Sequence, residues 1–224
     1  MEAAKPKALP AYLVLDTSRS MKPYEKLLND TLMSIYDTLF TSPQTSEFVH
    51  LSVISFNTRS HLVTPMTDIE QLRSLPKVVC DGWTNFGPMF QLVRSRIGED
   101  IERLSAAGTQ VLRPVAFILT DGSPTDSPKG SWTKDLDALL DRGFRAHPHT
   151  ISYGFGSASE EVLKRVSTLA AYRAEEGTHA TAEALTSALN SLLNSLVASA
   201  RARQLQVPQE VKGYKTVELD AVID

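Results

Sequence analysis

The sequence lacks the features that mark several specialised classes of protein. Its 224 residues contain one cysteine, Cys80, which excludes an internal disulfide bond or a multi-cysteine zinc ribbon and favours a reducing compartment. Cys80 is best interpreted as a small buried hydrophobic residue. Apolar runs such as residues 115–119 are too short to cross a bilayer, and residues 1–10 lack the apolar core of a signal peptide. We therefore expect a cytoplasmic protein with no membrane partner.

An excess of charge of either sign is also missing. The chain has 23 basic and 26 acidic side chains, a formal net charge of −3, which gives no electrostatic reason to expect nucleic acid as a partner. With 42% hydrophobic and 22% charged residues, the composition is typical of a globular protein with one well-buried core. We expect an N-terminal tail over residues 1–8, one domain over 9–200, and a C-terminal tail or edge segment over 201–224.

Strand-like and helix-like patterns alternate along the chain. Strands are expected at residues 11–16, 49–56, 60–66, 113–120, 150–155 and 172–174, and helices from residue 23 and along 90–104, 136–140, 160–168 and 185–196. Pro65 marks the hairpin partner at 60–66 as an edge strand, and Ser157 and Glu160 have the spacing of a capping box. The alternation predicts an α/β fold: a doubly wound, mostly parallel, Rossmann-like central sheet with one antiparallel edge strand and helices on both faces.

Two acidic residues follow predicted strands, Asp16 after the first and Asp121 after the strand at 113–120. In such a sheet, ligands bind beyond the carboxyl ends of the strands, where the winding direction reverses. Asp16, Ser18 and Ser20 place three oxygen-bearing side chains at alternate positions in the first of these turns. Their oxygens are hard ligands that suit Mg²⁺ or Mn²⁺. The spacing alone is a weak signal, because aspartate and serine are common in turns.

Together with two later motifs, this turn resembles a known family. Asp16, Ser18 and Ser20, then Thr84 in DGWTN (81–85), then Asp121 in TDG (120–122), resemble the metal-ion-dependent adhesion site of von Willebrand factor A domains. The resemblance covers about residues 9–200, including a later strand at ISYGFG (151–156). Through LPAY (9–12) and TDGSPTD (120–126), it is closest to the bacterial tellurium-resistance-associated A-domain proteins.

The resemblance implies a von Willebrand factor A type fold and a divalent cation, Mg²⁺ or Mn²⁺. The hydroxyls of Ser18, Ser20 and Thr84 would hold the ion, with Asp16 and Asp121 binding directly or through water. An Asp or Glu from another protein would complete the coordination. The implied function is a metal-dependent protein-binding module with no enzymatic activity, acting as a cytoplasmic scaffold or adaptor in tellurite or other stress responses. A kinase or phosphatase of such a system is the kind of partner implied.

One position departs from the family pattern, because Arg19 stands where a small residue is common. Its side chain either points outward, pairing with an acid or helping to recognise an acidic partner, or lowers the affinity for metal. Retained binding is favoured, since Ser18 and Ser20 face the ion while the alternate position between them faces away. Two further functions stay open: a magnesium-dependent phosphohydrolase with Asp16 as the attacking carboxylate, and a scaffold that has lost metal dependence through Arg19. Against the first, Ser18 stands where haloacid-dehalogenase-like enzymes need a second acid.

Several residues also have ordinary structural explanations. Asp16 and Asp121 could each cap a turn, Thr84 could be the N-cap of the next helix, and Trp83 could either lie exposed at a binding rim or fold over that helix. Asp126 is best interpreted as a turn residue. The remaining candidates are His147 and His149, for which we find no third zinc ligand, and Gly154 and Gly156, which fit a tight strand-to-helix turn better than a dinucleotide site.

Overall fold

A computed structural model of the chain describes residues 5–66, 77–175 and 181–219. The strands are β1 (Lys7–Asp16), β2 (Val49–Phe56), β3 (Ser60–Thr64), β4 (Gln110–Val111), β5 (Val115–Thr120), β6 (His149–Gly154), β7 (Ala170–Ala174) and β8 (Tyr214–Val217). The helices are η1 (Arg19–Tyr24, a 3₁₀ helix), α1 (Glu25–Phe40), α2 (Pro43–Ser46), α3 (Phe86–Ala106), α4 (Trp132–Leu140), α5 (Glu160–Val166) and α6 (Thr181–Ala202).

The strands form a single sheet in the order β3-β2-β1-β5-β6-β7-β8, with the short β4 also paired to β1. Strands β1, β2, β5, β6 and β7 run parallel, whereas β3 and β8 lie antiparallel at the two edges. Every residue of β5 is buried, which confirms that its unbroken apolar run belongs to a central strand covered on both faces. The predicted α/β fold class is therefore confirmed.

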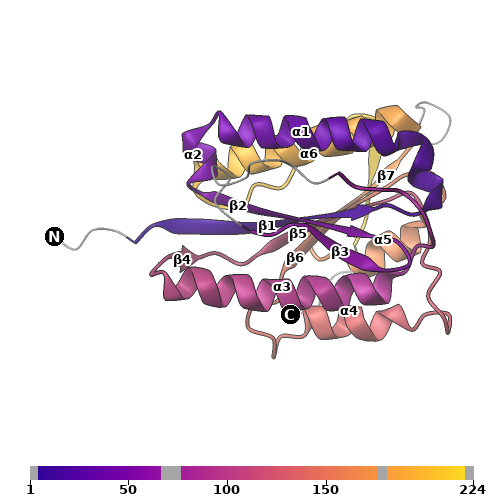
Figure 1. Cartoon of the computed structure of the whole chain (residues 1–224), viewed down its shortest axis with the longest axis horizontal. Coiled ribbons are helices and arrows are strands. Elements are labelled where there is room, and N and C mark those ends of the chain that lie inside the picture. The colour runs from indigo at the N-terminus through magenta and orange to yellow at the C-terminus, as the bar shows by residue number, and fades with distance from the viewer. Residues whose placement is uncertain (1–4, 67–76, 176–180, 220–224) are drawn as a thin grey trace.

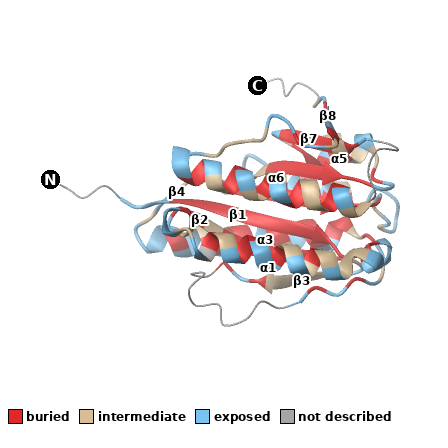
Figure 2. Cartoon of the chain, turned by 90° about the horizontal axis from the view of Figure 1, so that it is seen from above, coloured by how far each residue is buried: buried red, intermediate tan, exposed pale blue. Residues whose placement is uncertain are grey.

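Helices cover both faces of this sheet (Figure 1). Helices α1 and α6 lie side by side on one face, and α3 and α4 lie on the other. Alternate residues of β1 supply the two cores: Leu13 and Leu15 pack on the side of α1 and α6, while Tyr12 and Val14 pack on the side of α3 and α4. Figure 2 shows the consequence, a buried sheet between helices whose exposed residues face outward.

The second half of the chain differs from the prediction in two ways. A further strand, β8, follows β7 and pairs with it antiparallel, from Ala171 opposite Val217 to Ala174 opposite Tyr214. The predicted capping box is wrong, because the N-cap of α5 is Ser159, whose side chain accepts a hydrogen bond from the backbone N–H of Val162. The boundaries that we expect for the domain, at residues 9 and 200, stay a prediction.

A helix that spans a membrane needs about 20 consecutive, mostly apolar residues, and the helices of this chain were not expected to reach that. None of those in 5–66, 77–175 or 181–219 combines the length and the apolar character needed to cross a bilayer.

Candidate metal centre

The candidate centre lies at the carboxyl ends of two neighbouring parallel strands. Asp16 is the last residue of β1, and Asp121 directly follows Thr120, the last residue of β5. These strands pair with each other from Ala11 opposite Val115 to Leu15 opposite Leu119. The chain winds outward from β1 towards β2 on one side and from β5 towards β6 on the other. The two carboxylates therefore lie where the winding direction reverses, the position that a doubly wound sheet offers to a ligand.

Asp16 is almost fully buried, with 1% of its surface exposed. Its Oδ1 accepts a hydrogen bond of 2.9 Å from the backbone N–H of Ser18, which curls the turn after β1 back over the strand end. Its Oδ2 accepts a hydrogen bond of 2.6 Å from the hydroxyl of Thr120. The carboxylate of Asp16 is thus fixed from both β1 and β5.

The two serines connect Asp16 to Asp121. The Oγ atoms of Ser18 and Ser20 lie 3.1 Å apart within hydrogen-bonding reach, and the hydroxyl of Ser20 donates to Oδ1 of Asp121 at 2.9 Å. Three of the five predicted ligands, Ser18, Ser20 and Asp121, therefore form a chain of side-chain oxygens, which the backbone N–H of Ser18 connects to Asp16. Ser20 and Asp121 are separated by 101 positions in the sequence.

Thr84 reaches the same place from the loop before α3. Its backbone N–H donates to Oγ1 of Thr125 at 3.0 Å, and its carbonyl accepts from the N–H of Thr125 at 2.9 Å. A β-carbon built on Gly122 would lie 3.5 Å from the hydroxyl oxygen of Thr84, so this hydroxyl packs beside the residue that follows Asp121. All five predicted residues come together, and their binding of a metal stays a prediction.

A small pocket opens onto this group. It has a volume of about 250 Å³ and is lined by Ser18, Arg19, Ser20, Gly82, Trp83 and Thr84. Ser20 is exposed at this opening. Ser18 and Thr84 are 2% and 6% exposed, and are therefore as buried as Asp16 and Asp121, at 1% and 6%.

A glycine turn supports Asp121 from behind. The carbonyl of Asp121 accepts hydrogen bonds from the N–H of Ser157 at 2.8 Å and from its hydroxyl at 3.1 Å. Gly156 has φ of +55°, and a β-carbon there would lie 2.9 Å from the same carbonyl oxygen. Only glycine fits this close approach without strain. The turn interpretation of Gly154 and Gly156 is supported, and Ser157 serves this contact instead of capping α5.

The two carboxylates occupy an unfavourable electrostatic environment. Burial raises the pKa of Asp16 to about 6, with a further contribution from the charge of Asp121, although hydrogen bonds from Ser18 and Thr120 oppose the rise. Burial also raises the pKa of Asp121, against the hydrogen bond from Ser20. None of the salt bridges found between described residues involves either carboxylate. Two buried negative groups surrounded by hydroxyls fit a hard divalent cation, which would neutralise them.

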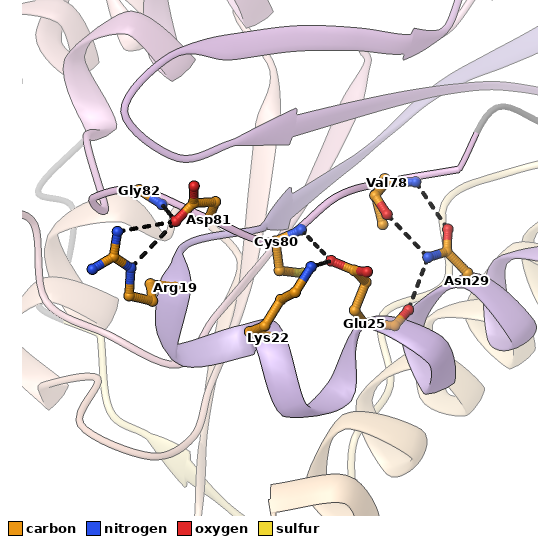
Figure 3. Close-up of polar contacts among 8 residues, drawn as sticks. All are labelled: Arg19, Lys22, Glu25, Asn29, Val78, Cys80, Asp81 and Gly82. Carbon is orange, nitrogen blue, oxygen red and sulfur yellow. Dashed lines mark hydrogen bonds and ion pairs between the residues drawn. The ribbon is translucent and has the colours of Figure 1, made fainter.

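Arg19 lines the pocket, but its charged guanidinium group is exposed and pairs with an acidic residue. Its side chain is 79% exposed, and both Nε and Nη2 donate to Oδ1 of Asp81 at 3.2 Å. Figure 3 shows this pair on the outer side of the turn. The side chain of Arg19 therefore points outward and pairs with an acid, which is one of the alternatives given by the sequence. Because the pair is exposed, it contributes little to stability.

Other residues hold the site without having been predicted to do so. The two carboxylate oxygens of Asp126 accept hydrogen bonds from the N–H groups of Phe86 (2.8 Å) and Gly87 (2.7 Å), at the start of α3. Asp126 is thus more than a turn residue, because it supplies the helix cap for which Thr84 was a candidate. The N-cap position is Asn85, without a side-chain cap. No local pattern signals a contact across 40 positions.

Trp83 is exposed over 67% of its surface, which decides between its two alternatives in favour of the rim. Its backbone N–H donates to Oγ1 of Thr58 at 2.9 Å. The preceding Gly82 has φ of +79°, and a β-carbon there would lie 2.4 Å from the same hydroxyl oxygen. The loop therefore presents the indole from a fixed backbone.

Among the described residues, His147 and His149 form no second metal site. Within the part of the chain that the structure describes, no three His, Cys, Asp or Glu side chains gather in a way that could hold a metal ion. The candidate centre differs in kind, because it has two carboxylates and its other donors are hydroxyls. Cys80 is buried and unpaired, as the interpretation of it as a small hydrophobic residue predicts.

Comparison with solved structures gives a consistent class of fold. Proximal thread matrix protein 1 from the mussel byssus matches with a TM-score of 0.56 at 14% identity, over 86% of this chain and 49% of that one. A von Willebrand factor type A protein from Catenulispora acidiphila matches with a TM-score of 0.54 at 12% identity, over 85% and 43%. A mutant of the PilB minor pilin from Streptococcus sanguinis matches with a TM-score of 0.57 at 12% identity, over 90% and 64%.

The chain has the von Willebrand factor A type of α/β fold. It spans about half of the matrix protein and 64% of the pilin, so these identities and lengths establish the fold alone. A further structure of the matrix protein is described as having a zinc-occupied metal-ion-dependent adhesion site. No protein-family model and no curated protein sequence matches the chain.

Proposed function

We propose that the protein is a protein-binding module that works through a bound divalent cation. Asp16, Ser18, Ser20, Thr84 and Asp121 would hold Mg²⁺ or Mn²⁺, and the ion would offer an open position to an Asp or Glu of another protein. The observation that carries the proposal is the buried pair of carboxylates linked through Ser18 and Ser20, by the backbone N–H of Ser18 at Asp16 and by the hydroxyl of Ser20 at Asp121. A neighbour in fold with a zinc-occupied adhesion site adds support for a metal at this place.

The chemistry follows from the balance of charge. Two carboxylates offset a 2+ ion when both bind it directly, which leaves the ion little attraction for an outside ligand. If a water molecule separates Asp121 from the ion, the ion becomes a stronger Lewis acid towards the carboxylate of a partner. Mg²⁺ keeps water ligands readily and suits such an exchange. The pocket lined by Ser18, Ser20 and Thr84 would be the side from which a partner approaches.

The rim of the pocket supplies the rest of the proposed contact. Trp83 is a large exposed aromatic residue on a backbone that is already ordered, so its burial by a partner would cost little conformational entropy. Arg19 and Asp81 flank the same opening as a neutral pair. We therefore propose that the partner presents its acidic residue beside an apolar one.

The setting of this interaction rests on the sequence resemblance alone. From it we propose a cytoplasmic scaffold or adaptor in a tellurite or other stress response, with a kinase or phosphatase as a partner. We also infer that the protein is not a phosphohydrolase. Both oxygens of Asp16 accept hydrogen bonds and the residue is 1% exposed, an arrangement that disfavours its use as a nucleophile.

Isothermal titration of the EDTA-stripped protein with MgCl₂ and MnCl₂ tests the metal. We expect one site per chain, lost in Asp121→Ala and Ser20→Ala and retained in Asp137→Asn, which removes an exposed carboxylate elsewhere. An Asp121→Ala variant that binds metal as well as the wild type would overturn the proposal.

Affinity purification with Mg²⁺ or with EDTA, read by mass spectrometry, tests the partner. We expect proteins that depend on both the cation and Asp121, and Trp83→Ala should weaken their binding by about tenfold or more while leaving the affinity for metal unchanged. Partners that bind equally well in EDTA and to Asp121→Ala would favour a scaffold that works without metal.

A further inference from the structure

The segment that leads to Thr84 lies across the start of α1 without joining the sheet (Figure 3). Val78 and Cys80 are buried, 3% and 1% exposed, and pack into the core beside α1, whereas Val79 between them is 64% exposed. This alternation resembles a strand, but the described structure gives residues 78–82 no strand partner. Their backbone polar groups must therefore be satisfied in another way.

Asn29 of α1 satisfies both backbone groups of Val78. Its Oδ1 accepts from the N–H of Val78 at 2.9 Å, and its Nδ2 donates to the carbonyl of Val78 at 3.0 Å. The same Nδ2 donates to the carbonyl of Glu25 at 2.8 Å, which fixes the orientation of the amide on the helix. One side chain thus pairs with Val78 as the backbone of a neighbouring strand would.

Glu25, one turn earlier on α1, makes the next contact. Its Oε2 accepts from the backbone N–H of Cys80 at 2.7 Å and from Nζ of Lys22 at 2.7 Å. These contacts, that of Cys80 first, hold the pKa of Glu25 below its usual value. The carboxylate is therefore charged at neutral pH and makes a strong, charge-assisted bond to the segment.

Two backbone hydrogen bonds connect the same segment to the turn that carries the serines. The N–H of Asp81 donates to the carbonyl of Thr17 at 2.9 Å, and the N–H of Arg19 donates to the carbonyl of Gly82 at 3.1 Å. Residues 78–82 are thus held by α1 on one side and by the turn containing Ser18 on the other. Thr84 follows two residues later.

From this arrangement we propose that Asn29 and Glu25 are positioning residues of the metal centre, which hold residues 78–82 in the one conformation that presents the hydroxyl of Thr84 to the cation. The inference rests on the proposed function, because it concerns the same centre. Neither residue touches the ion. Their effect is to remove the cost of ordering the loop before the ion binds.

Thermodynamic linkage makes the inference testable from both ends. If the ion needs the held conformation, then the bound ion must stabilise that conformation by the same factor. Cys80 reports on it directly, because it is the only cysteine in the chain and its thiol is buried beneath the segment. Local release of residues 78–82 exposes the thiol, so the rate of its reaction with a thiol reagent measures how often the segment opens.

The experiment combines Cys80 labelling by 5,5′-dithiobis(2-nitrobenzoate) with Mn²⁺ affinity measured by titration calorimetry, on the full chain. Asn29→Leu removes three hydrogen bonds while keeping the number and branching of the side-chain heavy atoms, and Glu25→Leu removes the bond to Cys80. Glu25→Gln keeps an oxygen acceptor for that N–H and serves as the conservative rescue. Asp30→Asn is the matched control, since Asp30 is an exposed neighbour on the same helix that pairs with Lys26.

We expect Asn29→Leu and Glu25→Leu to raise the metal-free labelling rate by about tenfold or more and to weaken Mn²⁺ binding by about tenfold or more. Glu25→Gln should stay within about threefold and Asp30→Asn within about twofold of the wild type. Saturating Mn²⁺ should slow labelling of the wild type about tenfold and leave Asp121→Ala unchanged. Circular dichroism spectra and melting temperatures identify any variant that is unfolded, and for such a variant the slowing of wild-type labelling by Mn²⁺ remains decisive.

The possible failures are distinguishable. A wild-type protein that binds no Mn²⁺ overturns the proposed function and the present inference with it. A wild type that binds Mn²⁺ while folded Asn29→Leu binds it equally well, or one whose Cys80 reacts at the same rate with and without Mn²⁺, overturns only the positioning role.

Discussion

Replacing Asp121 by asparagine should stabilise the metal-free protein while abolishing its stabilisation by metal. Asp121 is 6% exposed, its pKa is raised by burial, and its charge in turn raises the pKa of Asp16. Asparagine keeps the Oδ1 acceptor that receives the hydroxyl of Ser20 but removes one of two buried negative charges. A shift of about one unit in a pKa corresponds to about 1.4 kcal/mol, so removal of this buried charge is worth about 1–2 kcal/mol.

The assay is thermal unfolding of both proteins in EDTA and in Mg²⁺ or Mn²⁺. For a chain of this length, about 1 kcal/mol corresponds to about 2–4 °C in melting temperature, so Asp121→Asn should melt about 2–8 °C above the wild type in EDTA. Metal at about one hundred times its dissociation constant stabilises by about 2.7 kcal/mol, which should raise the wild type by about 5–10 °C and leave the variant unchanged. In metal, the difference between the two melting temperatures should therefore shrink or change sign.

A purely structural carboxylate predicts the opposite sign. If Asp121 served only to accept hydrogen bonds at the end of β5, its replacement would lower the melting temperature in EDTA, and metal would act equally on both proteins. That result would refute the electrostatic reasoning about the site. Asp137→Asn is the control, because Asp137 is exposed and pairs with Arg165; its effect should stay within about 0.5 kcal/mol in either buffer.

Three further predictions concern residues outside the ligand set. Burial lowers the pKa of His149 to about 4, so the folded state resists protonation and the free energy of unfolding falls as the pH drops below 6.5. Because His149 is only partly buried, we expect this residue to account for about 1–2 kcal/mol of the stability lost between pH 7 and pH 4.5, measured by urea unfolding. His149→Gln should abolish that part of the loss. Asp126→Ala leaves two N–H groups at the start of α3 without acceptors, so it should lower the free energy of unfolding in urea by about 1–3 kcal/mol. A decrease of less than about 0.3 kcal/mol would contradict the capping role. Gly156→Ala forces a β-carbon against the carbonyl of Asp121 at positive φ, so calorimetry should show Mn²⁺ affinity falling together with stability.

The periodicity of the sequence was sufficient to predict the longer strands and helices through α6, because each of them carries its own apolar pattern. It missed α2 and β4, which have only four and two residues. Helix α1 and strand β5 are long enough for the pattern to be unambiguous. Strand β8 was not predicted as a strand because it has four residues, of which Lys215 and Thr216 are exposed, and it follows a proline-interrupted stretch. Its pairing is decided by the free edge of β7, which the local sequence does not reveal.

Within the candidate centre, the sequence indicated the candidate donors and missed the contacts that hold them. Asp16, Ser18 and Asp121 were recognisable because they end or follow apolar strands. Thr120, which donates to Asp16, looked like an ordinary strand residue. The spacing of Ser157 and Glu160 indicated a capping box, but the hydroxyl of Ser157 donates to Asp121 and leaves capping to Ser159. Competing hydrogen bonds of this kind are decided by tertiary structure.

The donors of the site are positioned with different degrees of rigidity. Asp16 and Asp121 are attached to two central strands that pair along their length, so the sheet itself fixes their separation. Thr84 belongs to a loop, and its place depends on side chains that bind backbone groups, Asn29 and Glu25 before it and Thr125 beyond it. Loop contacts open at lower free energy than a central sheet does. It follows that regulation of the centre, by a partner or by substitution, would act most readily through Thr84, and that the carboxylates would keep their positions while it did so.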